Sequence, residues 1–272
     1  RHQIVSAQDY LESMRKGRFK GNEICLTFDD DLKCQYDIAL PVLREYGLTA
    51  FWFVYTSPLC GELQRLEVYR HFRCTHFEIV EQFYQAFLEK VRSTRYRDAV
   101  ERALSSFDPS AYAKEYAFYT EADKIFRFVR DDVLGQEAYY ELMDEMLDEA
   151  GYDRASLLDR LWMNANDLRD LHEAGHIIGL HSQTHPTTMG RLAAEAQAKE
   201  YQENHRILSE IIGRAPVTMA HPANSYNGDT LHVLLTLGIE LGFRANMADV
   251  ANRSRYEQPR EDHANIVKRM RQ

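Results

Sequence analysis

The sequence predicts an α/β protein built on a parallel sheet. Short apolar segments of strand length alternate with amphipathic segments of helical period, and Gly and Pro stand mostly between them. Clusters of polar side chains follow directly after two of the predicted strands. Repeated strand–helix units of this kind are typical of a barrel or of an open, doubly wound sheet.

The first strand–helix–strand unit lies near the start of the chain. Residues 24–28 predict a short buried strand, which is followed by Asp29, Asp30 and Asp31. Residues 36–46 predict a helix that ends at Gly47, and residues 49–55 predict a second buried strand.

The alternation stops at about residue 62 and resumes after residue 160. The stretch 62–160 predicts a helical insertion within a single domain spanning 1–272; its clearest helices are 77–91 and 136–150, and Ser110 is a candidate N-cap. Its aromatic residues are expected to fill helix–helix contacts. The later elements are predicted helices at 166–173, 192–212 and 230–237, and predicted strands at 176–180, 217–220, 242–245 and 264–267.

Composition excludes several classes of protein. The 272 residues carry a net charge of -9, with 44% apolar and 28% charged residues, which is ordinary for a globular protein and weighs against a non-specific nucleic-acid binder. No apolar run approaches the length that spans a bilayer. The four cysteines form no CxxC motif, and the start of the sequence carries no secretory signal pattern. We therefore expect reduced thiols and a cytoplasmic location.

Two polar clusters carry the candidate chemistry. Asp29 and Asp30 follow the first predicted strand, and His181 and His185 follow the strand 176–180. Neutral imidazoles and one carboxylate form a three-ligand set that leaves a metal position open for water, the pattern of a catalytic zinc site. A second carboxylate can then act as a base toward that water. Each cluster alone is more often a solvated turn or an incidental histidine pair, so the prediction depends on their joint position at strand ends.

Residues 27–30 (TFDD) and 181–186 (HSQTHP) resemble the first two motifs of the polysaccharide deacetylase family, the carbohydrate esterases with a NodB-type domain. The resemblance covers about residues 22–60 and 162–270. It implies a distorted (β/α) barrel of about seven units that hydrolyses the N-acetyl group of an amino sugar. It also implies Asp29 as catalytic base, and Asp30, His181 and His185 as ligands of Zn²⁺ or another divalent transition metal.

The third motif, at residues 221–227, is less faithful. Pro222, Tyr226 and Asn227 fit a family variant, but Ala223 and Asn224 replace an aromatic residue and a glycine. The resemblance implies that the backbone N–H of Ala223 helps to bind the oxyanion, and that Tyr226, Asn227 and His221 line the substrate site. The family's arginine is missing near Ala220.

Three further positions stay open. Arg260 is a possible substitute for the missing arginine, with a surface arginine as the alternative, and His263 and His221 are candidates for the general acid. Asp31 stands where the family usually has glycine; its carboxylate could strengthen metal binding, crowd the site or point to solvent.

These residues predict a metal-dependent carbohydrate N-deacetylase. The expected substrate is a nucleotide- or lipid-linked N-acetylated sugar, or an oligosaccharide, in the biosynthesis of a surface polysaccharide such as O-antigen. The alternatives are an amidase acting on a non-sugar amide and a catalytically inactive carbohydrate-binding protein of the same fold. The helical insertion could also serve homo-oligomerisation or partner docking.

Overall fold

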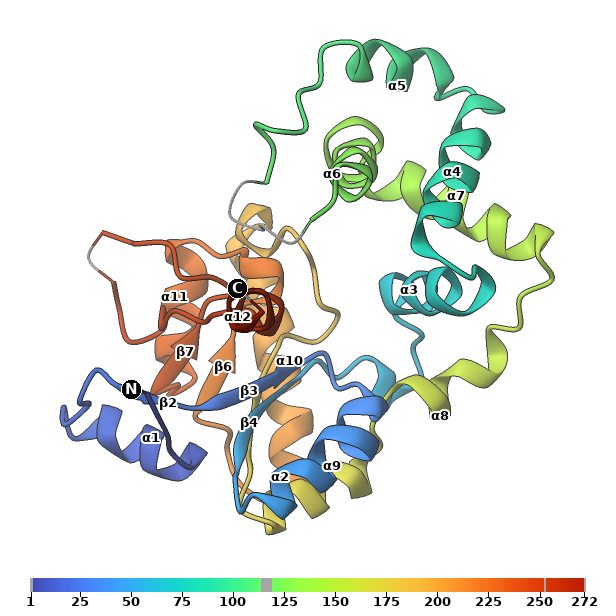
Figure 1. Ribbon diagram of the computed structural model, residues 1–272. Helices are drawn as coiled ribbons and strands as arrows, with labels where there is room; N and C mark the ends of the chain where they lie inside the picture. Colours follow the sequence, from blue (N-terminus) through green and yellow to red (C-terminus); the bar gives the residue numbers. More distant parts are fainter. Residues whose placement is uncertain (1, 114–118, 252, 272) are drawn as a thin grey trace. The chain divides into compact units, whose positions relative to one another are not determined.

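The computed structural model describes residues 2–113, 119–251 and 253–271. The chain divides into two compact units (Figure 1). The first comprises Arg1–Leu63 and Leu158–Asp262, and the second comprises Gln64–Leu157 and His263–Gln272. The organisation as a single domain with an insertion at 62–160 stays a prediction.

The first unit is built on a sheet of five parallel strands in the order β3-β4-β5-β6-β7. These strands are β3 (Leu26–Asp29), β4 (Ala50–Val54), β5 (Ile177–Leu180), β6 (Thr218–Ala220) and β7 (Leu241–Phe243). A short parallel pair, β1 (Gln3–Ile4) and β2 (Glu23–Ile24), forms a separate two-stranded sheet. The main sheet is thus a half-barrel of five strands rather than seven units, which still places the chain in the predicted class of distorted (β/α) barrels.

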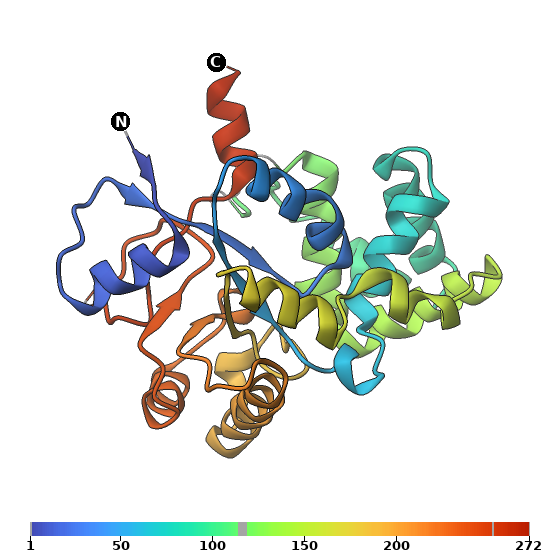
Figure 2. The same ribbon diagram turned by 90° about the horizontal axis from the view of Figure 1, so that it is seen from below.

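Helices cover both faces of this sheet. The predicted helices are confirmed as η1 (Gln35–Ala39) with α2 (Leu40–Glu45), α9 (Ala165–Glu173), α10 (Ala194–Ile212) and α11 (Gly228–Thr236). Their apolar side chains pack in one cluster with Trp52, Ile178 and Met219 of the sheet, and α10 and α11 lie side by side (Figure 2). The opposite face packs Phe51, Phe53 and Phe243 against α1 (Ala7–Arg15), a helix that the sequence analysis did not predict.

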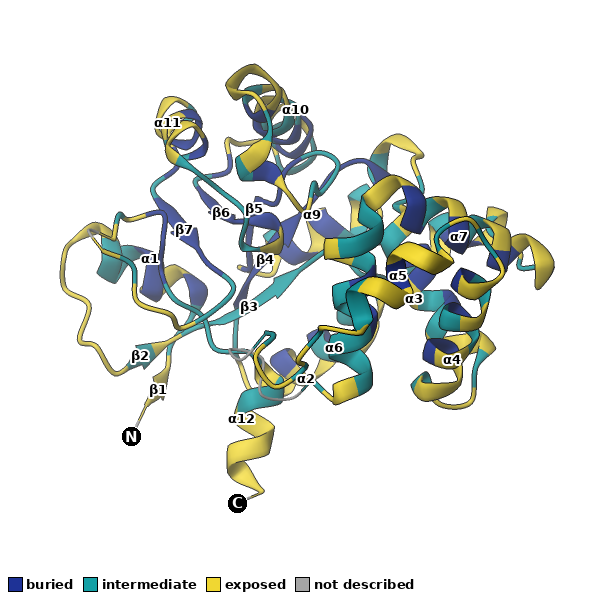
Figure 3. Cartoon of the chain, turned by 90° about the horizontal axis from the view of Figure 1, so that it is seen from above, coloured by how far each residue is buried: buried dark blue, intermediate teal, exposed yellow. Residues whose placement is uncertain are grey.

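The strands differ in burial. Strands β4 to β7 are buried along their whole length, whereas β3 is half-buried (Figure 3). Continuous apolar runs are typical of strands that are covered on both faces. Gly179 lies at the centre of β5, where an added Cβ would come within 2.7 Å of the Phe53 ring. Glycine at this position therefore leaves room for the Phe53 ring.

The second unit consists of helices packed through aromatic rings. Phe83, Phe87 and Phe126 form ring contacts of 5.1–6.1 Å with one another, as predicted for the aromatic residues of this stretch. Helices 77–91 and 136–150 are confirmed as α4 (Val80–Arg92) and α7 (Gly135–Glu149). The remaining elements of this unit are α3 (Arg65–His76), α5 (Arg97–Leu104), α6 (Glu121–Phe128), η3 (Val129–Leu134), η4 (Ala155–Leu157) and α12 (His263–Met270).

Three local predictions are wrong. Residues 264–267 lie in helix α12 and not in a strand, because so short a segment does not by itself distinguish the two. Ser110 caps no helix: residues 111–113 are not helical, and α6 has its N-cap at Thr120. The strand predicted at 24–28 is divided at Cys25 between β2 and β3. The short elements η2 (Pro58–Cys60), α8 (Leu158–Leu161), η5 (Met189–Arg191) and η6 (Pro222–Asn224) complete the chain.

Candidate metal centre and its surroundings

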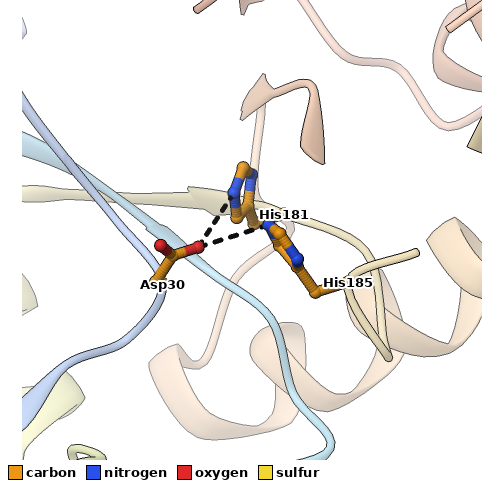
Figure 4. A group of neighbouring side chains, drawn as sticks. All are labelled: Asp30, His181 and His185. Atoms are coloured by element: carbon orange, nitrogen blue, oxygen red, sulfur yellow. Dashed lines mark ion pairs between the residues drawn. The ribbon is translucent and has the colours of Figure 1, made fainter. Parts of the chain in front are cut away.

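Asp30, His181 and His185 lie together at the carboxyl-terminal edge of the main sheet (Figure 4). Asp30 follows β3 and His181 follows β5, and both strands pair with β4. The Asp30 Oδ1 atom lies 3.4 Å from His181 Nε2 and 3.3 Å from His185 Nε2. All three ligand atoms lie within 4.8 Å of one another. One carboxylate oxygen and two imidazole nitrogens at this spacing fit a divalent transition metal.

The ring of His181 is oriented by its second nitrogen. His181 Nδ1 lies 2.9 Å from the carbonyl oxygen of Ala220, at the end of β6, and the side chain is 2% exposed. A hydrogen on Nδ1 donates to this carbonyl and leaves the lone pair of Nε2 directed toward Asp30. Histidines that bind metals commonly make such a contact, which fixes the tautomer and the ring plane.

Nearby carboxylates change the proton affinity of His181. Burial alone would lower its pKa, but the charges of Asp29 and Asp30, with a hydrogen bond to Asp30, outweigh burial and raise the pKa. In the metal-free protein His181 is therefore protonated more readily than an exposed histidine. Protons and a metal ion compete for the same nitrogen, so metal binding is expected to weaken as the pH falls.

Asp29 is paired with Arg260. The guanidinium NH1 and NH2 groups donate to the two carboxylate oxygens of Asp29 at 2.7 Å each, and NH1 also donates to Thr27 Oγ1 at 3.2 Å. Burial would raise the pKa of Asp29, but the charges of Arg260 and His181 and the hydrogen bonds from Arg260 hold it below its usual value. Asp29 is thus ionised near neutral pH, and its Oδ2 lies 3.9 Å from His181 Nε2.

The turn after β3 explains how neighbouring residues reach one place. Asp30 and Asp31 both have positive φ angles, of 79° and 57°. Asp is among the few residues besides Gly that adopt this left-handed conformation at moderate cost, which accounts for Asp31 at a position where the family usually has glycine. The Asp31 side chain is 1% exposed, so of the three alternatives it does not point to solvent. Neither of its carboxylate oxygens has a hydrogen-bond partner among the described residues.

The third motif forms a tight turn after β6. Ala223 and Asn224 have φ angles of 48° and 57°, so the turn takes up two consecutive left-handed residues. Asn224 occupies this conformation in place of glycine and accepts a hydrogen bond from the Ala245 amide at 2.9 Å. Ala223 is exposed, which is compatible with the predicted contact between its backbone and substrate.

The predicted substrate residues Asn227 and Tyr226 both make side-chain hydrogen bonds within the protein. Asn227 caps helix α11: its Oδ1 accepts from the Thr230 amide at 3.1 Å, and its Nδ2 donates to the Gly190 carbonyl at 2.8 Å. Its side-chain amide is therefore engaged within the protein. The hydroxyl of Tyr226 donates to Glu257 at 2.8 Å.

His221 is 1% exposed and unsuited to contact substrate or to act as general acid. Its ring stacks on that of Tyr226 with a centroid separation of 4.1 Å, and its Nε2 donates to the Tyr256 carbonyl at 2.9 Å. Burial lowers the pKa of His221 to about 3, so the ring is neutral at physiological pH. The other candidate acid, His263, is exposed at the start of α12 in the second unit, and its role stays a prediction.

Sequence reasoning missed two polar residues that contact the segment carrying the histidines. Glu200 and Asn204 lie one turn apart on α10 and bind backbone groups of residues 181–184. The signal for them was available, because Asn204 lies among the apolar residues Tyr201 and Leu208 on the buried face of that helix.

The structure thus defines a parallel α/β protein with an Asp–His–His cluster and a paired Asp–Arg at the ends of its strands. The family model described as polysaccharide deacetylase matches residues 131–242, which confirms the resemblance to that family. This range contains both histidines and the third motif, whereas Asp29 and Asp30 precede it. No curated protein matches the chain.

Solved structures of deacetylases share the fold. The chain is similar to Streptococcus pyogenes deacetylase PplD in complex with acetate, with a TM-score of 0.53 and 13% identity over 98% of this chain and 79% of that one. The chain is also similar to the BpsB deacetylase domain from Bordetella bronchiseptica, with a TM-score of 0.52 and 12% identity over 95% of this chain and 78% of that one. For IcaB from Ammonifex degensii the TM-score is 0.51 and the identity 14%, over 95% of this chain and 75% of that one.

Proposed function

We propose that this chain is a metal-dependent N-deacetylase acting on an N-acetylated sugar. The observation that carries the proposal is the convergence of Asp30, His181 and His185 beside an ionised Asp29. A divalent ion held by these three residues would supply Lewis-acid chemistry, lowering the pKa of water and polarising an amide carbonyl. No helix among the described residues is long and apolar enough to cross a membrane.

Asp29 is proposed to act as the general base. Its carboxylate lies within 3.9 Å of His181 Nε2, so water at the metal position would be within its reach. Arg260 donates to both carboxylate oxygens of Asp29 and so fixes the plane of the carboxylate. We propose that Arg260 replaces the arginine that the third motif lacks. The backbone N–H of Ala223 is proposed to stabilise the oxyanion.

The proposed substrate is an amino sugar on its way to a surface polysaccharide of the O-antigen type, carried on a nucleotide or a lipid. The family supports an N-acetylated sugar, and the carrier is our own extension. A cytoplasmic location is part of the same proposal. The test is acetate release from UDP-linked N-acetylated sugars, compared with chitooligosaccharides and small non-sugar amides, by the protein loaded with zinc.

Two variants separate the proposed roles. Asp29→Asn is expected to retain bound zinc and lose acetate release, because only the base is removed. His181→Ala is expected to lose both. Full turnover by a His181→Ala protein would contradict the metal centre. Zinc binding and sugar binding without acetate release from any substrate would instead identify a catalytically inactive carbohydrate-binding protein.

A further inference from the structure

The segment that carries both histidines, residues 181–186, has a strained backbone; we call it the ligand loop. Ser182 and His185 have φ angles of 66° and 55°, in the left-handed region that favours glycine. Such residues cost on the order of 1 kcal/mol or more each and persist only where the surroundings hold them. The ligand loop therefore depends on contacts that keep His185 directed toward Asp30.

Glu200 supplies the contacts at the centre of the loop. Its Oε2 accepts hydrogen bonds from the backbone N–H groups of Gln183 and Thr184 at 3.0 and 2.8 Å, and its Oε1 accepts from Thr184 Oγ1 at 2.7 Å. Hydrogen bonds to an ionised carboxylate are about twice as strong as neutral ones. One side chain of α10 thus binds two consecutive backbone donors between the two histidines.

Asn204 supplies the contacts at the start of the loop. It lies four residues after Glu200 on the same face of α10 and is fully buried. Its Oδ1 accepts from the His181 amide at 3.0 Å, while its Nδ2 donates to the Val54 carbonyl at 2.9 Å and to Thr56 Oγ1 at 3.2 Å. Asn204 therefore ties the first histidine to the end of strand β4, which pairs with β3 and so with the strand that carries Asp30.

We propose that Glu200 and Asn204 are positioning residues for the metal centre, acting through the backbone of the ligand loop and touching neither metal nor substrate. The inference rests on the proposed function, since it assumes that His181 and His185 bind a metal. The proposal is that affinity for the metal is set partly by these two polar side chains of α10, through their hydrogen bonds to the ligand loop.

The test compares Glu200→Ala, Glu200→Gln and Glu203→Ala. Glu203 lies three residues further along α10, where it pairs with the exposed Arg206, and serves as the matched control. Zinc affinity is measured in the folded protein with a competing chelator. We expect the dissociation constant to rise about tenfold or more in Glu200→Ala, as for other groups that orient metal ligands. It should rise less in Glu200→Gln, whose amide oxygen still accepts from N–H groups, and stay unchanged in Glu203→Ala.

A second measurement uses the metal-free protein. Hydrogen exchange at the amides of Gln183 and Thr184 should become faster in Glu200→Ala and not in Glu203→Ala. Zinc affinity within twofold of wild type for Glu200→Ala, with His185→Ala impaired, would overturn the positioning role alone. A wild-type chain that binds zinc no more tightly than His185→Ala would overturn the metal centre itself, and this inference with it.

Discussion

Asp29 combines burial with a bidentate contact to Arg260, and the contact decides its charge. Replacing Arg260 with Ala removes the positive charge while leaving burial, so the pKa of Asp29 should rise. Because a general base must be ionised, the acidic limb of the kcat/KM profile should move to higher pH. We expect kcat/KM near neutral pH to fall about tenfold or more, since charge-assisted hydrogen bonds are worth about 1.5–3 kcal/mol.

Arg260→Lys provides the matched comparison. Lysine keeps the charge but not the two-pronged contact, so it should shift the pH profile less than alanine does. Zinc content should be unchanged in both variants, because Arg260 donates its hydrogen bonds to Asp29, which is not one of the three proposed ligands. An acidic limb that stays in place in Arg260→Ala would contradict the role assigned to this pair.

Asp31 is a buried carboxyl whose ionisation opposes folding. Burial, and the charges of Asp167 and Asp30, raise its pKa well above the usual value. The folded state therefore holds a proton that the unfolded state releases, and stability falls as the pH rises above the unfolded pKa of about 3.9. We expect Asp31→Asn to stabilise the metal-free protein at pH 7 by ~1 kcal/mol or more.

The gain from Asp31→Asn should shrink as the pH falls below the unfolded pKa of about 3.9, where the wild-type carboxyl becomes protonated in both states. Asparagine also tolerates the positive φ at this position, so backbone strain is matched. Denaturant unfolding at several pH values, in the presence of a chelator, measures the difference. A gain independent of pH would show that charge is not its cause.

At the scale of elements, Asn227 caps α11 and is also a predicted substrate residue, so its substitution separates the two roles. Asn227→Ala removes the cap and the contact to Gly190, so the free energy of unfolding should fall by about 0.5–2 kcal/mol. Asn227→Asp retains a capping oxygen and should recover part of the loss. The KM for the sugar should be unchanged in both variants; a large rise in KM with unaltered stability would restore the substrate role.

The buried strands of the main sheet were predicted well. Residues 49–55, 176–180, 217–220 and 242–245 are confirmed as β4 to β7, because buried parallel strands are apolar along their whole length. The failures lie where local sequence is ambiguous: 264–267 is too short to distinguish strand from helix. Helix α1 was missed, although Ser6 caps it and its buried Tyr10 and Leu11 belong to the core.

At the scale of the whole molecule, the proposed metal centre joins β3, β5 and the ligand loop, so a bound ion should stabilise the fold. At a free zinc concentration 100 times the dissociation constant, the free energy of unfolding should increase by about 2.7 kcal/mol. The increase should diminish as the pH falls, because the raised pKa of His181 favours the protonated ring. Thermal unfolding with zinc or with chelator measures it, and His181→Ala should show no response.

The two-unit division frames the remaining hypotheses on the insertion. The second unit has its own core of ring contacts. A role of the insertion in dimerisation or partner docking stays a prediction, which measuring the mass of the protein in solution would test. His263, which begins α12 in the same unit, is a predicted general acid. Substituting it with alanine and measuring acetate release tests that prediction.

Residue type and spacing along the chain were enough to predict the class of fold, a resemblance to the polysaccharide deacetylase family and the candidate residues Asp29, Asp30, His181 and His185, because strands, turns and short motifs are local. Contacts between distant segments were decided by the tertiary structure, and the sequence offered Arg260 only as one of two alternatives. The pairing of Arg260 with Asp29 spans 231 positions, and Asn204 reaches the end of β4 across 150. Such contacts depend on the order of the strands and on which helix face is buried, and these follow from packing of the complete core.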